Sequence, residues 1–369
     1  MRLTKTLVAM ALLSSTADAA AIAKRSSSFY DTQKLANTQY GPIPGGSHLY
    51  SSYRGKAPPF PANITDPILP TKKGEAATDD QVWQNLLSAE WVILSFYQQG
   101  VESFNKTSFT DAGYPNTTYD RIQEIRDNEA GHLRIFQDKI SDKSIKPGAC
   151  KYQFPFHDPV SFLALVTFIE ISSMAFLTGL VQEAKLPASQ GAMVAIAETE
   201  SRHETWSLID VWNANPFAGP SDTVFPYANQ ILDTTNVFVV NGSCPKENPI
   251  YPNPRQNLPL LQTIPVKKSV EPGSVVALNF TGTPNFKEGR QYYTTFFHGP
   301  WNVTVPIETK EWPKKIIEVE IPSVFENRGI IIAVVTDTIG APTLDSVVAG
   351  PAIILEQPAE LGAELAASV

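Results

Sequence analysis

Two four-residue segments of the same pattern, Glu-x-x-His, occur far apart in the chain. They run from Glu129 to His132 and from Glu200 to His203. Residues three positions apart lie on one face of an α-helix, so each segment can direct a carboxylate and an imidazole toward the same point. The pattern therefore favours helices in this region, with both pairs facing a common interior.

Each segment follows a single glutamate in an apolar run of helical periodicity. Glu90 lies in NLLSAEWVILSFY, and Glu170 lies in SFLALVTFIEISSMAFLTGL. The order Glu, Glu-x-x-His, Glu, Glu-x-x-His is the ligand set of a carboxylate-bridged two-metal site inside a four-helix bundle. The sequence thus predicts six metal ligands, namely Glu90, Glu129, His132, Glu170, Glu200 and His203.

The alternative is that these six residues are ordinary buried polar groups. Glutamate is rarely buried without a partner, and four carboxylates in an apolar interior would lose their hydration and repel one another. Two divalent cations would balance those charges. Carboxylate and imidazole ligands suit iron or manganese, and the lack of thiolate ligands disfavours structural zinc. We therefore expect two Fe (or Mn) ions as cofactors.

Four helices are expected between residues 78 and 213. The first begins with acidic capping residues at Thr78–Asp80 and ends at Gly100. The second covers about 117–141. An aspartate followed by proline opens the third, over 158–184, and the fourth runs from about 189 to 213.

Two further residues lie close to the predicted ligands along the helices. Tyr97 follows Glu90 by one heptad on the same stripe, so it is a candidate hydrogen-bond donor or radical trap. A core aromatic residue whose hydroxyl finds another partner is the alternative. Glu204, one turn beyond Glu200, is a weaker candidate for contact with a ligand.

The C-terminal part has a different pattern. Residues 214–259 form a proline-rich connection, and residues 260–358 contain seven short β-prone runs separated by turn residues. This spacing predicts a β-sandwich of immunoglobulin or fibronectin type, followed by a tail at 359–369. This half carries no catalytic motif, and binding of cell-wall glycan or of protein is the role open to it.

The N-terminus is typical of a secreted protein. Residues 1–20 read as a signal peptide, with basic residues, a short apolar stretch and a small-x-small cleavage site. An irregular arm follows over 21–77, with a dibasic cleavage site after Arg25 that has chance occurrence as its alternative. These features predict an extracellular or cell-wall location.

Sequons and cysteines agree with export. The predicted N-glycosylation sites are Asn63, Asn105, Asn116, Asn241, Asn279 and Asn302. The two cysteines, Cys150 and Cys244, are expected to form a disulfide in an oxidising compartment, although two buried free thiols remain the alternative.

Composition excludes several classes of protein. A 43% hydrophobic share and an 18% charged share are typical of globular domains, and 369 residues allow two of them. The net charge of -8, without a basic cluster, argues against binding of nucleic acid. Residues 160–180 are the most apolar stretch after the N-terminus, but Glu170 lies within them, so no membrane span is expected.

The six predicted ligands, in their order and spacing, make residues 78–213 resemble the ferritin-like superfamily. The full layout is similar to secreted fungal ferritin-like proteins linked to stress response and late sexual development, which are relatives of plant desiccation-related proteins. This resemblance implies an α+β multidomain chain with a ferritin-like four-helix bundle before the β-sandwich. A glycosylated bundle with an added sandwich differs from ferritin itself, and this difference disfavours a mineral-storing shell.

Two functions follow from these observations. In the first, Glu129 and Glu200 bridge two metal ions, with Glu90 and Glu170 as terminal ligands, and the protein is a di-iron oxidoreductase that reacts with O₂ or peroxide. Ferroxidase, peroxidase and oxidase activities all stay open. In the second, the protein is a non-catalytic extracellular or cell-wall component with a structural or relic metal site.

Overall fold

The computed structural model describes residues 65–217, 225–266, 270–326 and 329–355. The predicted signal peptide, the dibasic pair, the arm up to residue 64 with Asn63, and the tail at 359–369 lie outside these residues.

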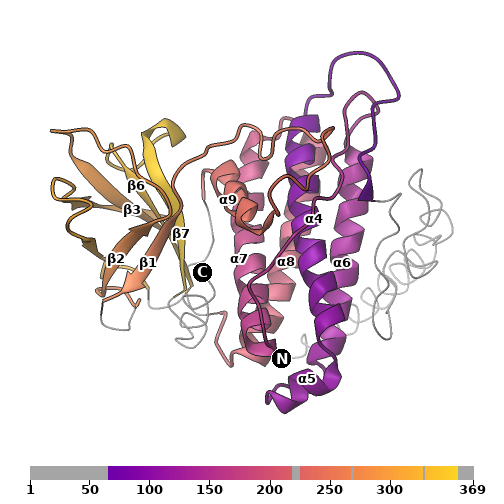
Figure 1. Ribbon diagram of the computed structural model, residues 1–369, viewed down its shortest axis with the longest axis horizontal. Coiled ribbons are helices and arrows are strands. Elements are labelled where there is room, and N and C mark those ends of the chain that lie inside the picture. The colour runs from indigo at the N-terminus through magenta and orange to yellow at the C-terminus, as the bar shows by residue number, and fades with distance from the viewer. Residues whose placement is uncertain (1–64, 218–224, 267–269, 327–328, 356–369) are drawn as a thin grey trace, which may run out of the picture. The chain divides into compact units, whose positions relative to one another are not determined.

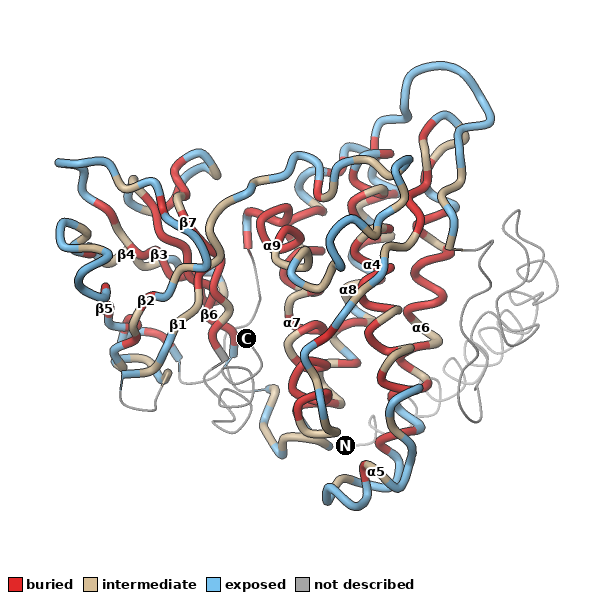
Figure 2. Tube along the Cα trace, in the orientation of Figure 1, coloured by how far each residue is buried: buried red, intermediate tan, exposed pale blue. Residues whose placement is uncertain are grey.

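Four long helices lie side by side in the N-terminal part (Figure 1). They are α4 (Asp80–Ser103), α6 (Thr118–Lys139), α7 (Pro159–Glu183) and α8 (Pro187–Trp206), and a short α5 (Lys106–Asp111) connects α4 to α6. Their inward-facing apolar residues belong to one hydrophobic core. Figure 2 shows that burial extends along most of α4, α6 and α7.

Local sequence explains where these helices begin. The Asp158 carboxylate accepts a hydrogen bond from the Ser161 backbone N–H at 2.8 Å, and Pro159 occupies the first helical position of α7. Before α8, the Asp79 carboxylate accepts the backbone N–H groups of Lys185 and Leu186, at 2.9 and 3.0 Å. The residue that precedes α4 therefore also fixes the turn into α8.

The predicted end of the first helix at Gly100 is wrong, because α4 continues to Ser103. A Cβ atom at Gly100 would lie 2.2 Å from Cε2 of Phe162, so α7 packs its ring directly on the α4 backbone. The glycine allows close packing between two helices rather than a helix end.

The fourth helix also differs from its predicted extent. Regular α-helix ends at Trp206, and a π-helical turn, η1 (Ser207–Val211), follows it. The Trp212 backbone N–H donates to the Ser207 carbonyl at 3.2 Å, which is the five-residue spacing of a π-turn.

By length and composition alone, α7 is able to cross a membrane, which the sequence interpretation did not expect. However, 78% of its apolar window is buried inside the protein. Its hydrophobicity is therefore accounted for by its position among the other helices.

The connection after the helices is more ordered than its proline content predicts. It contains α9 (Ala228–Thr234) and a 3₁₀ turn, η2 (Thr235–Phe238). A Cβ at Gly179 would lie 2.7 Å from the Phe225 carbonyl oxygen, so this segment packs closely on α7. The predicted disulfide between Cys150 and Cys244 is present and ties the connection to the loop between α6 and α7.

All seven predicted β runs form strands in two antiparallel sheets. They are β1 (Leu261–Pro265), β2 (Val275–Phe280), β3 (Tyr292–His298), β4 (Trp301–Ile307), β5 (Ile317–Glu320), β6 (Ile330–Thr336) and β7 (Val347–Leu355). One sheet has the order β1-β2-β5 and the other β4-β3-β6-β7. Residues of both sheets, such as Val276 and Phe296, share a second hydrophobic core. The α+β fold class is confirmed, with a β-sheet region separate from the helical one.

Candidate metal centre

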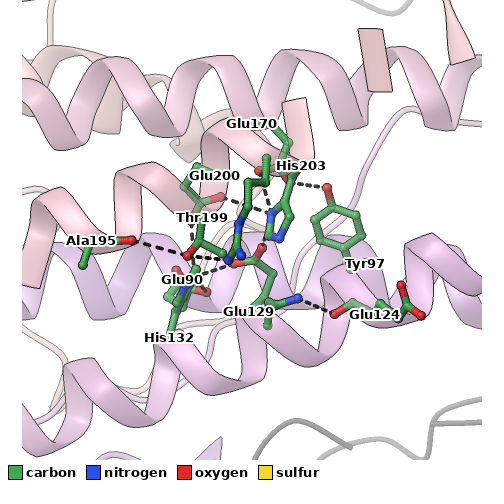
Figure 3. Close-up of polar contacts among 12 residues, drawn as sticks. Glu90, Tyr97, Glu124, Glu129, His132, Glu170, Ala195, Thr199, Glu200 and His203 are labelled. Atoms are coloured by element: carbon green, nitrogen blue, oxygen red, sulfur yellow. Dashed lines mark hydrogen bonds and ion pairs between the residues drawn. The ribbon is translucent and has the colours of Figure 1, made fainter. Parts of the chain in front are cut away.

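The six predicted ligands converge in the interior between the four long helices. Figure 3 shows their side chains directed toward one another. Glu90 comes from α4, the first Glu-x-x-His pair from α6, Glu170 from α7 and the second pair from α8. All six are buried, and the most exposed of them, His203, retains only 6% of its surface. Helical spacing and apolar flanking residues are what bring them together.

Two of the glutamates span both histidines. Glu129 places Oε2 3.1 Å from Nδ1 of His132 and Oε1 3.2 Å from Nδ1 of His203. Glu200 places Oε1 3.2 Å from His132 and Oε2 3.6 Å from His203. Each carboxylate thus offers one oxygen to each half of the cluster, which is the geometry of a bridging ligand.

The other two glutamates each contact one histidine only. Glu90 Oε1 lies 3.8 Å from Nδ1 of His132, and Glu170 Oε2 lies 3.3 Å from Nδ1 of His203. Ligand atoms from Glu129, Glu170, Glu200 and His203 all lie within 4.8 Å of one another, as do those from Glu90, Glu129 and His132. The cluster therefore divides into a His132 half and a His203 half, each able to hold a metal ion.

Unsatisfied oxygens show that the residues fit such ions. Oε1 of Glu90, Oε1 of Glu129 and Oε2 of Glu200 are buried and accept no hydrogen bond. Among the described residues, the ion pairs of the four glutamates are with the two histidines alone. Buried carboxylate oxygens without donors cost free energy that a coordinated cation recovers.

Burial and mutual repulsion act on the carboxylate pKa values. Burial, followed by the charge of Glu129, holds the pKa of Glu90 well above its usual range, and burial and Glu200 do the same for Glu170. Burial also acts to raise the pKa of Glu129 and Glu200. For these two, the contacts with both histidines outweigh it and hold the pKa below the usual range.

The histidines respond in the opposite direction. Burial disfavours the charged imidazole, but Glu129 and Glu200 outweigh it and raise the pKa of His132 to about 10. The same competition, led on the attractive side by Glu170, raises the pKa of His203. Without a metal ion, the two imidazolium groups are the cations that hold the carboxylates together.

Tyr97 contacts a predicted ligand directly, as one of its two interpretations required. Its hydroxyl donates a short hydrogen bond to Oε1 of Glu170 (Figure 3). Because the other oxygen of Glu170 faces His203, this bond fixes the orientation of the carboxylate.

Glu204 is not part of the cluster. Its carboxyl is largely covered, and burial raises its pKa to about 7. Its carboxylate makes no hydrogen bond or ion pair among the described residues, and it belongs to neither group of possible metal ligands.

The remaining histidines within the described residues lie elsewhere. His157 is exposed next to the N-terminus of α7. His298 is buried in β3, where its Nδ1 donates to the Ile330 carbonyl at 2.8 Å. Neither approaches the cluster.

The sequence interpretation missed one group of residues at the site. The buried Thr167 and Ser207, one turn from Glu170 and His203, form a hydrogen-bonded group with the half-buried Trp212. Helical periodicity places Thr167 and Ser207 on inner stripes, but no sequence signal places the Trp212 indole beside them.

Comparison with known proteins agrees with this geometry. Residues 78–208 match the family model of the ferritin-like domain. A search of curated proteins gave no match to the chain. The helical region is therefore a ferritin-like domain, and its buried Glu/His cluster is compatible with a dinuclear metal site.

Proposed function

Because the helical region is a ferritin-like domain, we propose that it is a four-helix bundle holding a carboxylate-bridged dinuclear centre for redox chemistry. The observation that carries this proposal is that Glu129 and Glu200 each reach both histidines through separate oxygens. A carboxylate in a single-metal site has no need to span two imidazoles.

In this proposal each residue has a defined role. Glu129 and Glu200 would bridge the two metal positions. Glu90 and His132 would complete one metal position, and Glu170 and His203 would complete the other. Bound iron (or manganese) would supply redox chemistry with O₂ or peroxide. The protein excludes bulk water through burial of every ligand, and Tyr97 holds Glu170 in place.

The net charge of the site supports binding of cations rather than of anionic substrates. With all four carboxyls ionised and both imidazoles neutral, the six ligands carry four negative charges. Two divalent cations would neutralise this charge and release the histidine protons.

A secreted setting is the second part of the proposal. The disulfide supports it, because disulfides persist in oxidising compartments. All predicted glycosylation sites within the described residues are exposed, namely Asn105, Asn116, Asn241, Asn279 and Asn302. The strand order of the two sheets supports an immunoglobulin- or fibronectin-like sandwich as an extracellular module. We also propose the stress-related or developmental role that the fungal resemblance implies.

The rival function has one observation in its favour. Every ligand is buried, and Phe136 stacks on His132 with ring centroids 6.3 Å apart. An enclosed site of this kind also suits a structural metal that stabilises an extracellular or cell-wall protein.

The experiment compares wild-type protein, Glu129→Ala and the matched control Glu124→Ala, whose side chain lies on α6 and pairs with Arg121. Each is loaded anaerobically with Fe(II) or Mn(II) and then exposed to O₂ or peroxide. The proposal predicts consumption of oxidant by wild type and control and none by Glu129→Ala. Loaded wild-type protein that consumes neither oxidant, while Glu129→Ala loses only stability, would establish the rival function.

A further inference from the structure

The two halves of the cluster have different surroundings, and we propose that Thr167, Ser207 and Trp212 form a hydroxyl clamp that preorganises the His203 half. Because of the clamp, the His203 half binds a metal ion with higher affinity than the His132 half. This inference rests on the proposed dinuclear site and assigns the order in which its positions fill.

The clamp joins α7 to the end of α8 at a single point. The hydroxyl oxygens of Thr167 and Ser207 lie 2.5 Å apart, and both residues are fully buried. The indole Nε1–H of Trp212 donates to Oγ1 of Thr167 at 2.9 Å. Thr167 precedes Glu170 by three residues and Ser207 follows His203 by four, so each lies one turn from a predicted ligand.

The direction of each hydrogen bond follows from counting protons. Thr167 Oγ1 has one proton, and the Leu163 carbonyl, 3.1 Å away, can only accept it. The Trp212 indole can only donate. Ser207 must then donate its own proton to Thr167. The threonine oxygen is therefore saturated by two donors and one acceptor, and it is fixed in both position and rotamer.

The π-turn explains how the tryptophan reaches this point. In a continuous α-helix, Val211 would follow Ser207 on the same face at a four-residue spacing. The turn over Ser207–Val211 widens the spacing to five, and it is Trp212 that returns toward α7. π-turns within helices are frequent at functional sites. Here the wider turn supplies the third member of the clamp.

Among the residues that the structure describes, the His132 half has no comparable clamp. The inner residues one turn from its ligands are apolar, namely Leu86 and Leu94 beside Glu90, and Phe136 beside His132. Apolar side chains pack the helices at these positions, and a hydrogen bond that α6 donates to α4, from Arg126 to Oε1 of Gln98 at 3.3 Å, lies one turn from the bridging Glu129 rather than beside Glu90 or His132. In the His203 half, by contrast, Tyr97 and the hydroxyl clamp hold α4, α7 and α8 through directed bonds.

This difference predicts unequal affinities. A ligand that is already oriented loses less conformational freedom when a metal ion binds. Groups hydrogen-bonded to metal ligands change metal affinity by about 10- to 100-fold when removed, and the clamp acts one helical turn further from the ligands. Loss of the clamp should therefore weaken the tighter step of metal uptake by about tenfold and leave the weaker step unchanged.

The experiment is a stepwise anaerobic titration of the metal-free full chain with Co(II), followed by calorimetry and visible absorption. Thr167→Val replaces the hydroxyl by a methyl group of the same size, and Ser207→Ala removes the second hydroxyl. Thr167→Ser retains a hydroxyl and should restore wild-type behaviour. The matched control is Thr178→Val, whose hydroxyl bonds only the Ala175 carbonyl of its own helix, at 2.8 Å.

Ligand variants assign the two steps. Glu170→Gln should weaken the same step as Thr167→Val, whereas Glu90→Gln should weaken the other. A shifted Co(II) absorption band in Thr167→Val separates a change in ligand position from simple loss of stability, which thermal melting of the metal-free variants measures.

The outcomes separate the two proposals. Failure of wild-type protein to bind Co(II) would overturn the dinuclear site and the clamp with it. Two bound ions with unchanged affinity in both Thr167→Val and Ser207→Ala would overturn the clamp alone. Weakening of the Glu90-dependent step would also overturn it, because the clamp would then act on the wrong half.

Discussion

Replacement of the bridging glutamates by glutamine tests the division of the cluster into two halves. In Glu129→Gln one carboxylate oxygen becomes an amide nitrogen, which donates hydrogen bonds and does not bind metal ions. The two oxygens of Glu129 lie near different histidines, at 3.1 Å from Nδ1 of His132 and 3.2 Å from Nδ1 of His203. In the variant, one metal position therefore loses a ligand atom and both metal positions lose negative charge. Glu90→Gln alters only the His132 half, where the carboxylate lies 3.8 Å from the imidazole.

The expected loss of metal affinity follows from this difference between the two variants. Removing groups that merely orient a ligand costs up to about 100-fold in metal affinity, so removing a charged ligand should cost at least that much. Glu129→Gln is thus expected to weaken both positions by about 100-fold or more, and Glu90→Gln only one. At a free metal concentration that just saturates the wild-type protein, the wild type binds about two ions per chain. Under the same conditions Glu129→Gln should bind almost none and Glu90→Gln about one.

Equilibrium dialysis with elemental analysis measures these ratios directly. Glu124→Gln, on the same helix as Glu129 but paired with Arg121, is the control and should bind as wild type does. Equal losses in Glu129→Gln and Glu90→Gln would refute the assignment of Glu129 as a bridge, whatever the total metal content.

Three further predictions concern stability. In metal-free protein the pKa of His132 is raised from 6.5 to about 10. The protonated histidine therefore stabilises the fold fully below pH 6.5, and this stabilisation is lost as the pH rises toward 10. Thermal melting should show the decline in stability with pH, and bound metal should flatten this decline. Gly100→Ala should lower the free energy of unfolding by about 1–3 kcal/mol through overpacking against Phe162. Gly191→Ala, with no atom within 4 Å of the added Cβ, should raise the free energy of unfolding by up to about 1 kcal/mol. Denaturant titration distinguishes the two variants. Replacing both cysteines by serine opens a loop with a sequence separation of 94 residues and should cost up to about 5 kcal/mol, and an unchanged denaturation midpoint would contradict this.

The convergence of the six candidate ligands was predictable because its signal is local. Glu129 and His132 need only a helix to face the same way, and the apolar residues around Glu90 and Glu170 specify which side is inward. The start of α7 was predictable for the same reason, since Asp158 caps it through its own neighbour.

Features that depend on distant contacts were not predictable. Gly100 has the composition of a helix end, yet its role is set by Phe162, a residue 62 positions away that only the fold brings near. The helical turns of α9 lie in a proline-rich segment whose order comes from packing on α7. The π-turn has no periodic signal at all, because it depends on the contact between Trp212 and Thr167.

The β strands form an intermediate case. Alternation of apolar residues located all seven, but the pairing of β2 with β5 across two intervening strands is a long-range choice that no single run encodes. The bridging roles of Glu129 and Glu200 were inferred from their motif, whereas the split of their oxygens between two histidines required coordinates.

The metal content of protein purified from its own host, before any chelating step, tests the central claim most directly. A dinuclear carboxylate centre predicts about two Fe or Mn ions per chain, lost in both Glu129→Ala and His203→Ala. Protein that contains no such metal and takes up no Fe(II) under anaerobic conditions would contradict the claim. The burial of these glutamates and histidines would then need an explanation without a metal.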